Sequence, residues 1–408
     1  MAMKLATGAQ QQFWGVLEAT TAFDTVVKPV AADAMPLLNL DINPTKDFHK
    51  VMERTGTGSL KKEVAGQHGG TWSATFYVKP EGTTTNAEPD VGAIFTAAFG
   101  AVGTSGDVSY TNYTGSGENF EPRSLQFHKR AGAHHYEVIS GCWVEQLEFS
   151  VTANEIPTVT ATGGFSSYGF AFGATLNGAG STSNAYVTVD AGQAQRFRAG
   201  SYIQFNEGGT ARNNSGNFYK VTSIDTTNHR VNISPNPEQA LDDDTTIEAA
   251  PHSQTLTSNN PVDAVGSALT LGGNEVGFIS ASVTFATGIT GRREGHQGQP
   301  TGLTGGVREV TGTLNCYMNA TDVAGITTTE SFGDISRIIG DAWNGNVLAA
   351  VIRAGANTSK ERMKINLPAI RPNVTAVEIP EAEAATCNIT FTARVGSTNG
   401  DEISIDFD

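Results

Sequence analysis

Three histidines, His128, His134 and His135, form the densest group of potential metal ligands in the sequence. A zinc site needs three or four ligands held in a closed geometry, and clustered histidines alone meet little of that requirement. The surrounding residues alternate between polar and apolar types, which predicts strands over Ser124–Lys129 and Tyr136–Ile139. We therefore interpret the histidines as the polar end of a hairpin rather than as a metal centre.

Two further segments carry groups that could bind an ion or a phosphate. Asp242–Asp244 supplies three carboxylates, but the alternating oxygen ligands, the Gly and the Glu of an EF-hand loop are absent. Thr55–Lys62 is rich in glycine but does not have the G-x-x-x-x-G-K-S/T spacing of a phosphate-binding loop. We interpret the first segment as a solvated acidic turn and the second as a connector.

The motifs of common catalytic centres are missing, since the sequence contains neither G-x-S-x-G nor H-E-x-x-H. A glycosidase can take its two acids from distant positions, but pairs such as Glu145 and Glu148 fall on mixed faces of a predicted strand. Cys142, Cys316 and Cys387 stand far apart without a C-x-x-C motif, which indicates reduced structural cysteines. We predict that the chain is not an enzyme and uses no cofactor and no metal.

The composition favours strands joined by many turns. Of the 408 residues, 46 are Gly and only 16% are charged, a mixture that disfavours long helices. The 41 acidic and 26 basic residues give a net charge of −15, so the chain would repel a polyanion. Met1–Phe13 lacks the basic-then-apolar order of a signal peptide, and no apolar run approaches the ~20 residues of a membrane helix. We expect a soluble protein that is made in the cytoplasm and does not insert into a membrane.

Alternation with a period of two residues is the main structural signal, and it predicts unusually long strands. One face of each strand is apolar, whereas the other carries mostly small hydroxyl and amide groups. Such strands fit a large antiparallel sheet that is covered on one side only. The runs with this pattern are Trp72–Val78, Trp143–Val151, Ile279–Phe285, Arg308–Met318 and Cys387–Val395.

Two helices are predicted from apolar residues at helical spacing. The first runs from Val91 to Val102 and stops at Gly103, and a shorter one lies near Asp334–Trp343. One or both should cover the apolar face of the sheet. Asn43–Gly70 and Thr290–Gly306 are long, rich in glycine and without clear periodicity, so we expect them to be loops.

Short strands separated by turns distinguish the segment from about 175 to 262. They are Tyr186–Val189, Gly200–Phe205, Phe218–Ile224 and Arg230–Ile233, a spacing typical of a small barrel or sandwich. Stretches rich in Gly, Ser and Asn flank the segment, and long strands resume beyond it. We therefore predict a larger domain in two parts, 1–174 and 263–408, and an inserted small β-barrel or Ig-like domain at 175–262.

The order of several short motifs resembles the tail tube proteins of long-tailed bacteriophages (siphophages) across about 1–165 and 265–408. A long glycine-containing segment precedes a strand that ends at Lys79–Pro80 and a helix that ends at Phe99–Gly100. The insertion of roughly ninety residues departs from the minimal pattern of this family. The motifs that follow in order are Ser124–Phe127, Ser140–Leu147, Ile279–Ser282, Gly306–Leu314, Leu367–Pro368, Thr386–Val395 and Gly400–Ile405.

This resemblance implies a mainly-β fold, namely a tail-tube-like β-sandwich or rolled barrel with one or two flanking helices, plus the inserted small β domain on the outside. It implies a structural subunit that assembles into stacked hexameric rings, which form the conduit for DNA ejection into the host. The implied partners are further copies of the chain and the tape measure, tail tip and tail terminator proteins, while double-stranded DNA passes without specific binding. The implied location is the tail of the virion, after synthesis in the host cytoplasm.

Two sets of residues acquire expected roles from this hypothesis. Polar faces of the long strands should line the channel, because acidic and short polar groups make no stable contacts with phosphates. Apolar side chains in Asn43–Gly70 should make contacts between rings. The expected lumen-lining set is Gln146, Glu148, Thr152, Ser280, Ser282, Thr284, Thr311, Thr313, Asn388, Thr390 and Thr392, and the inter-ring set is Phe48, Val51, Met52 and Leu60.

Two other classes of protein are compatible with this composition. A capsid-decoration or adhesin-type β-sandwich protein would share it, but would not need long strands with a hydroxyl-rich second face. A depolymerase-like carbohydrate enzyme of the β-helix type should contain short internal repeats, and none is apparent in the sequence.

Overall fold

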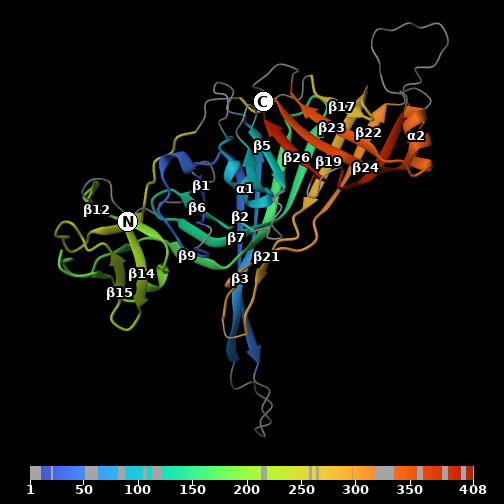
Figure 1. The fold of residues 1–408 in the computed structure, drawn as a ribbon. Helices are drawn as coiled ribbons and strands as arrows, with labels where there is room; N and C mark the ends of the chain where they lie inside the picture. The colour runs from blue at the N-terminus through green and yellow to red at the C-terminus, as the bar shows by residue number, and fades with distance from the viewer. Residues whose placement is uncertain are drawn as a thin grey trace.

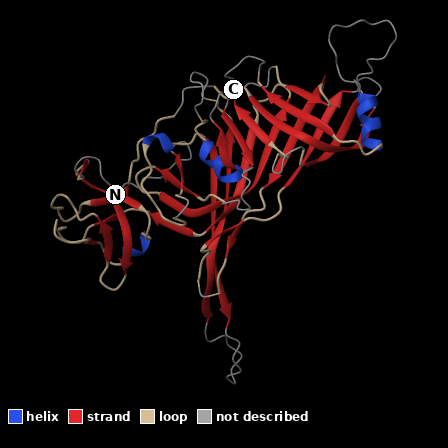
Figure 2. Ribbon diagram, in the orientation of Figure 1, coloured by secondary structure: helices blue, strands red, loops and turns tan. Residues whose placement is uncertain are grey.

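A computed structural model gives the fold of the chain. It describes residues 11–19, 22–50, 63–80, 88–103, 108–112, 122–212, 218–256, 260–262, 266–295, 297–317, 335–355, 362–378, 385–396 and 401–407. Strands account for 58% of these residues and helices for 6%, which confirms the predicted mainly-β fold. Figure 2 shows long strands through most of the molecule and only short helices. Within these ranges no helix is long and apolar enough to cross a membrane.

Eight strands form one continuous antiparallel layer, which organises the protein (Figure 1). Within the body of the molecule, alternation of small polar and apolar residues gives these strands one buried and one accessible face. We refer to this part as the eight-stranded layer. In spatial order its strands are β2 (Leu37–Lys50), β3 (Glu63–Tyr77), β8 (Thr158–Phe165), β7 (Tyr136–Thr152), β19 (Phe278–Ala286), β22 (Glu309–Tyr317), β25 (Thr386–Arg394) and β24 (Met363–Glu378).

The first half of β24 belongs to a second group of strands. There it pairs with β23 (Leu348–Ala354) on one side and with β26 (Ser404–Phe407) on the other. Apolar residues of this group and of the eight-stranded layer belong to the same buried cluster, so the two groups enclose one core. Further strands extend the second group: β17 (Ala268–Leu271) and β18 (Asn274–Val276) beyond β23, and β5 (Val108–Asn112) and β4 (Gly100–Gly103) beyond β26.

Strand β7 has 17 residues and serves two sets of neighbours. Its second half pairs with β8 and β19, whereas its first half pairs with β6 (Leu125–Ala131) and β9 (Ser167–Ala171). Strand β6 continues to β1 (Gln11–Leu17). The change of neighbours occurs near Gly141, whose φ of +60° lies in a region that favours glycine.

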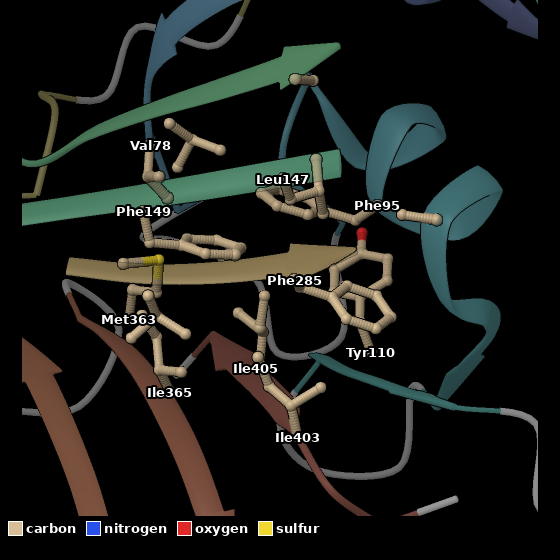
Figure 3. Packing of buried hydrophobic residues seen from close by; sticks show 14 of the residues in the cluster. Val78, Phe95, Tyr110, Leu147, Phe149, Phe285, Met363, Ile365, Ile403 and Ile405 are labelled. Atoms are coloured by element: carbon tan, nitrogen blue, oxygen red, sulfur yellow. The ribbon is translucent and has the colours of Figure 1, made fainter. Parts of the chain in front are cut away.

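Helix α1 (Gly92–Phe99) covers the apolar side of the strands, as predicted, and it is almost entirely buried. Its Phe95 ring contacts four other aromatic rings, with centroids 5.2 Å from Tyr110, 5.6 Å from Phe407, 5.9 Å from Phe76 and 6.3 Å from Phe149. Figure 3 shows Phe95, Tyr110 and Phe149 in the core beside the helix, together with Met363 and Ile365 from the second group of strands. The predicted end at Gly103 is wrong: the helix ends at Phe99, Gly100 caps it in a left-handed conformation, and Gly100–Gly103 form β4.

Helix α2 (Ile335–Trp343) confirms the second predicted helix. It is followed by Gly345, which has a φ of +74° and whose N–H bonds to the carbonyl of Ala342. Ile339 packs against the core, but Trp343 is 91% exposed. This helix therefore lies at the rim of the core and does not fill it as α1 does.

A second sheet occupies residues 174–249 and has its own apolar cluster. An additional bridge between Leu176 and Val189 joins the two ends of its strand path, so the sheet closes into a small barrel. The cluster also includes Tyr136, Val138 and Ala171 from β7 and β9. Whether this small barrel folds alone, as predicted for 175–262, stays a prediction. Its strands are β10 (Ala174–Thr175), β16 (Thr246–Ala249), β12 (Tyr202–Glu207), β14 (Tyr219–Asp225), β15 (Arg230–Ser234) and β11 (Tyr186–Thr188), with β13 (Thr210–Ala211) beside β12.

The prediction of a loop over Asn43–Gly70 is wrong for the residues that the structure describes. Residues 43–50 and 63–70 are strand residues that extend β2 and β3 into a hairpin projecting from the body (Figure 1). Thr290–Gly306 likewise contains a small ribbon of β20 (Thr290–Arg292) and β21 (Gly302–Thr304). Most side chains of the β2 part of this projecting hairpin are exposed, so no buried face imposes an alternating pattern on its sequence.

Candidate functional site

All eleven residues expected to line a channel lie on the accessible face of four adjacent strands, β7, β19, β22 and β25. The strand registers place them in rows that cross the sheet. In one row Glu148 is opposite Thr284, and Thr284 is opposite Thr311. Other members of the set that lie opposite each other are Thr311 and Thr392, Ser282 and Thr313, Thr313 and Thr390, and Thr152 and Ser280. Gln146 lies opposite Thr162, and Asn388 lies opposite Asn315. The structure thus brings the whole set together, and its role stays a prediction.

The polar face extends beyond the strands from which it was predicted. Thr160 of β8 is opposite both Glu148 and Thr75 of β3, and its hydroxyl lies 3.3 Å from the Thr75 hydroxyl. At the other end of the strand order, on the same face, Arg371 of β24 is opposite Thr392 of β25. Sequence reasoning left Thr160 out although Thr158, Thr160 and Thr162 alternate with apolar residues, a signal that could have identified it.

A shallow hollow lies on this face over β19, β22, β25 and β24. Its walls are mostly hydroxyl and amide groups, with the guanidinium of Arg371 as its charged group. Some of these groups bond to the sheet itself: Thr390 Oγ1 donates to the carbonyl of Asn373 over 3.3 Å. Gly312 has no side chain here because a Cβ would lie 2.4 Å from the buried Phe391 ring and 2.4 Å from the Ser282 carbonyl. The lining residues are Ser282, Thr284, Thr311, Gly312, Thr313, Arg371, Asn373, Thr390, Phe391 and Thr392.

The charged side chains of the polar face are few, exposed and mostly acidic. Asp41, Glu148, Glu309 and Glu378 are acidic, whereas Arg371 and Arg394 are basic. A surface of this kind hydrogen-bonds readily to water but offers little attraction to a polyanion.

The two ends of the eight-stranded layer have open edges. Among the described strands, β2 pairs only with β3, and the Arg371–Glu378 half of β24 pairs only with β25. Pro44 in β2 and Pro372 in β24 are residues that sheets accept mainly at their edges. Unpaired backbone groups on a long edge favour addition of another strand.

The projecting hairpin carries the one inter-ring candidate that the structure describes. Phe48 is 56% exposed on β2, with the ammonium group of Lys46 lying 5.5 Å from its ring centroid. Val64 on the facing strand is 48% exposed. Val51, Met52 and Leu60 lie outside the described residues. Thus the hairpin presents apolar groups to solvent at a distance from the core.

The interpretation of His128 as part of a polar hairpin end is wrong. Its side chain is completely buried, and its Nδ1 lies 2.5 Å from the Tyr136 hydroxyl, which in turn lies 3.3 Å from Nε2 of His252. Burial lowers the pKa of His128, and it lowers the pKa of His252 to about 3, with Lys28 and Arg130 adding to the effect. These groups join the small barrel to β6 and β7. In the part of the chain that the structure describes, no group of three His, Cys, Asp or Glu side chains could hold a metal ion.

No protein-family model matches this chain, and no curated protein matches it. The sheet, its edges and the projecting hairpin are therefore the features of the molecule that bear on its function.

Proposed function

We propose that this chain is the structural subunit of a bacteriophage tail tube, in which stacked hexameric rings form a conduit for DNA ejection. The observation that carries the proposal is the eight-stranded layer, which has a buried apolar side, an accessible hydroxyl-rich side and two open edges. A monomer gains little from such a surface. In a ring, neighbouring copies would cover the edges, and the polar rows would face a common channel.

The electrostatics of the polar face support transport rather than binding of DNA. Short hydroxyl side chains dominate, and acidic groups outnumber basic ones. The chain as a whole carries a net charge of −15. A channel wall of this kind would not hold the phosphate backbone, because tight binding of duplex DNA depends on neutralising phosphates with Lys and Arg.

Electron microscopy of the purified protein tests the proposal directly. Negative staining should show hollow tubes or six-fold rings with a central hole. Compact particles without a hole would contradict the proposal and support the alternative of a capsid-decoration or adhesin-type β-sandwich protein.

A matched pair of variants tests whether the open edge of β24 forms the contact between neighbouring copies in a ring. Val377 is 44% exposed in the half of β24 that has an open edge, and Leu256 is 42% exposed outside any strand. Lysine at a sheet edge opposes pairing with another strand. We expect Val377→Lys to remain folded but to form no rings, whereas Leu256→Lys should form rings like the unmodified protein.

A further inference from the structure

The projecting hairpin is supported on one side where it leaves the eight-stranded layer. The last pair between β3 and β8 joins Gly70 to Phe165. Beyond this point the edge of β3 is held by the segment that follows β20: the His68 N–H donates to the Gly298 carbonyl over 2.7 Å, and His68 Nε2 lies 2.8 Å from Oε1 of Gln299. A two-stranded hairpin is only marginally stable in water by itself. These contacts therefore help to hold the hairpin in one direction relative to the body of the protein.

Gln299 connects this support to the body of the protein. While its Oε1 faces His68, its Nε2 donates to Oδ2 of Asp24 over 2.9 Å. The carboxylate of Asp24 also accepts the hydroxyls of Ser140, Ser167 and Ser166, over 2.6, 2.6 and 3.1 Å. Ser140 belongs to β7 and Ser167 to β9, so one carboxylate links the hairpin support to two strands.

Asp24 is itself fixed in position. Its φ of +60° is uncommon for a residue with a side chain, and its N–H donates to Oε2 of Glu18 over 2.8 Å. The buried Glu18 carboxylate also accepts the Gly141 N–H over 2.7 Å and the Ser124 hydroxyl over 2.6 Å. A Cβ at Gly141 would lie 2.9 Å from Cζ of Phe23 and 3.3 Å from Cβ of Asp24, so the glycine allows the segment around Asp24 to pack closely on β7.

We infer that Gln299 and Asp24 are positioning residues that fix the direction of the projecting hairpin relative to the eight-stranded layer. Each link from His68 to β7 and β9 is a directional hydrogen bond, and those to Asp24 are charge-assisted. The inference rests on the proposed function in one respect: a hairpin held in one direction loses less conformational freedom when it contacts another copy.

Distances between two spin labels measure the direction of the hairpin without any assembly. Cysteines placed at Lys50 on the hairpin and at Glu155 on the body are exposed, whereas the three native cysteines are buried and should not react with the label. The measurement uses the full chain at a concentration where it is unassembled. Gln299→Leu removes both links. Gln254→Leu is the matched control, because Gln254 is also half-buried and accepts one hydrogen bond, from Gln12, far from the hairpin.

We expect a single narrow distance distribution for the parent and for Gln254→Leu, and one at least about twofold wider for Gln299→Leu. In this variant the hairpin keeps the backbone bond from His68 to Gly298 and the bond from Arg293 to Gln67, but it loses the side-chain link to Asp24 that fixes its direction. Gln299→Glu should also widen it by placing a carboxylate against Asp24, and adding Asp24→Asn should narrow it again by restoring a donor and an acceptor. A narrow distribution in Gln299→Leu, or no rescue by the second substitution, would overturn the inference. Failure of the parent protein to form tubes would instead overturn the proposed function and leave this result unaffected.

Discussion

Burial of His252 should make the stability of this protein strongly dependent on pH. The ring is 4% exposed and lies between the small barrel and the main body. It contacts Trp14 and Phe218 edge to face, with centroids 5.5 and 5.1 Å away. The charged groups that oppose its protonation are Lys28 and Arg130. No acidic group is among the causes that shift its pKa, so the folded protein favours the neutral ring.

The magnitude follows from the difference in pKa between the two states. The pKa of His252 is about 3 in the folded protein, against an ordinary value of 6.5 that applies to the unfolded chain. Below pH 6.5 the unfolded chain takes up a proton that the folded protein does not, so the free energy of unfolding falls as the pH is lowered towards 3. Each pH unit is worth about 1.4 kcal/mol, so His252 alone should reduce the free energy of unfolding by roughly 3 kcal/mol at pH 4.5. Buried His128 acts in the same direction.

Denaturant unfolding at pH 7.5 and at pH 4.5 measures this effect. His252→Phe keeps an aromatic ring among Trp14, Tyr202 and Phe218 but cannot take up a proton. We expect the loss of stability between the two pH values to be roughly 3 kcal/mol smaller in this variant than in the parent protein. Acidic residues elsewhere affect both proteins equally, so they cancel in the comparison.

Trp14→Phe is the control for a simple loss of packing. It removes the bond from Trp14 Nε1 to the Ser253 carbonyl, 2.9 Å long, but it retains His252. This variant should be less stable at both pH values and should keep the full pH dependence of the parent. If His252→Phe also kept the full pH dependence, the reasoning about a buried neutral histidine would be refuted.

Three further predictions concern the sheet, the hairpin and the small barrel. Gly312→Ala should lower the free energy of unfolding by about 1–3 kcal/mol in denaturant titrations, because the added methyl group overlaps Phe391; Gly340→Ala in α2 meets no atom within 4 Å and should be neutral or stabilising. Deleting residues 47–66 should leave a folded protein that forms no tubes in electron micrographs, and tubes of normal length would contradict the role of the hairpin. Joining residue 174 to 264 with a Gly/Ser linker should preserve rings but lower the melting temperature, since Tyr136 and Val138 lose their cover; a folded variant without rings would instead place the small barrel in the assembly interface.

The long strands could be predicted from the sequence because each has one buried face. In the second half of β7 and in β19 the apolar residues are buried in one core, so burial imposes a two-residue period there. The outer part of β2 has no such face, and its residues show no comparable period. Its strand conformation depends on pairing with β3, which leaves little trace in the sequence of either strand.

The buried histidine contact could not be predicted because its partners are remote in the sequence. His128 and Tyr136 are eight residues apart on neighbouring strands, but His252 is 116 residues from Tyr136. A histidine near the end of a hairpin is usually at least partly exposed, but the rings of Tyr136, Tyr202 and His252 surround this one. The support of the hairpin by Gln299 was missed for the same reason, since Gln299 is 275 residues from Asp24.

The length of β7 has a mechanical consequence. One half of this strand contacts the small barrel through Tyr136 and Val138, and the other half carries part of the polar face. A force applied to the small barrel along the strand direction would load the backbone hydrogen bonds to four neighbouring strands in shear, so that many bonds would have to break together. Tension applied at the small barrel would therefore reach the polar face along one continuous strand, without passing through a flexible linker.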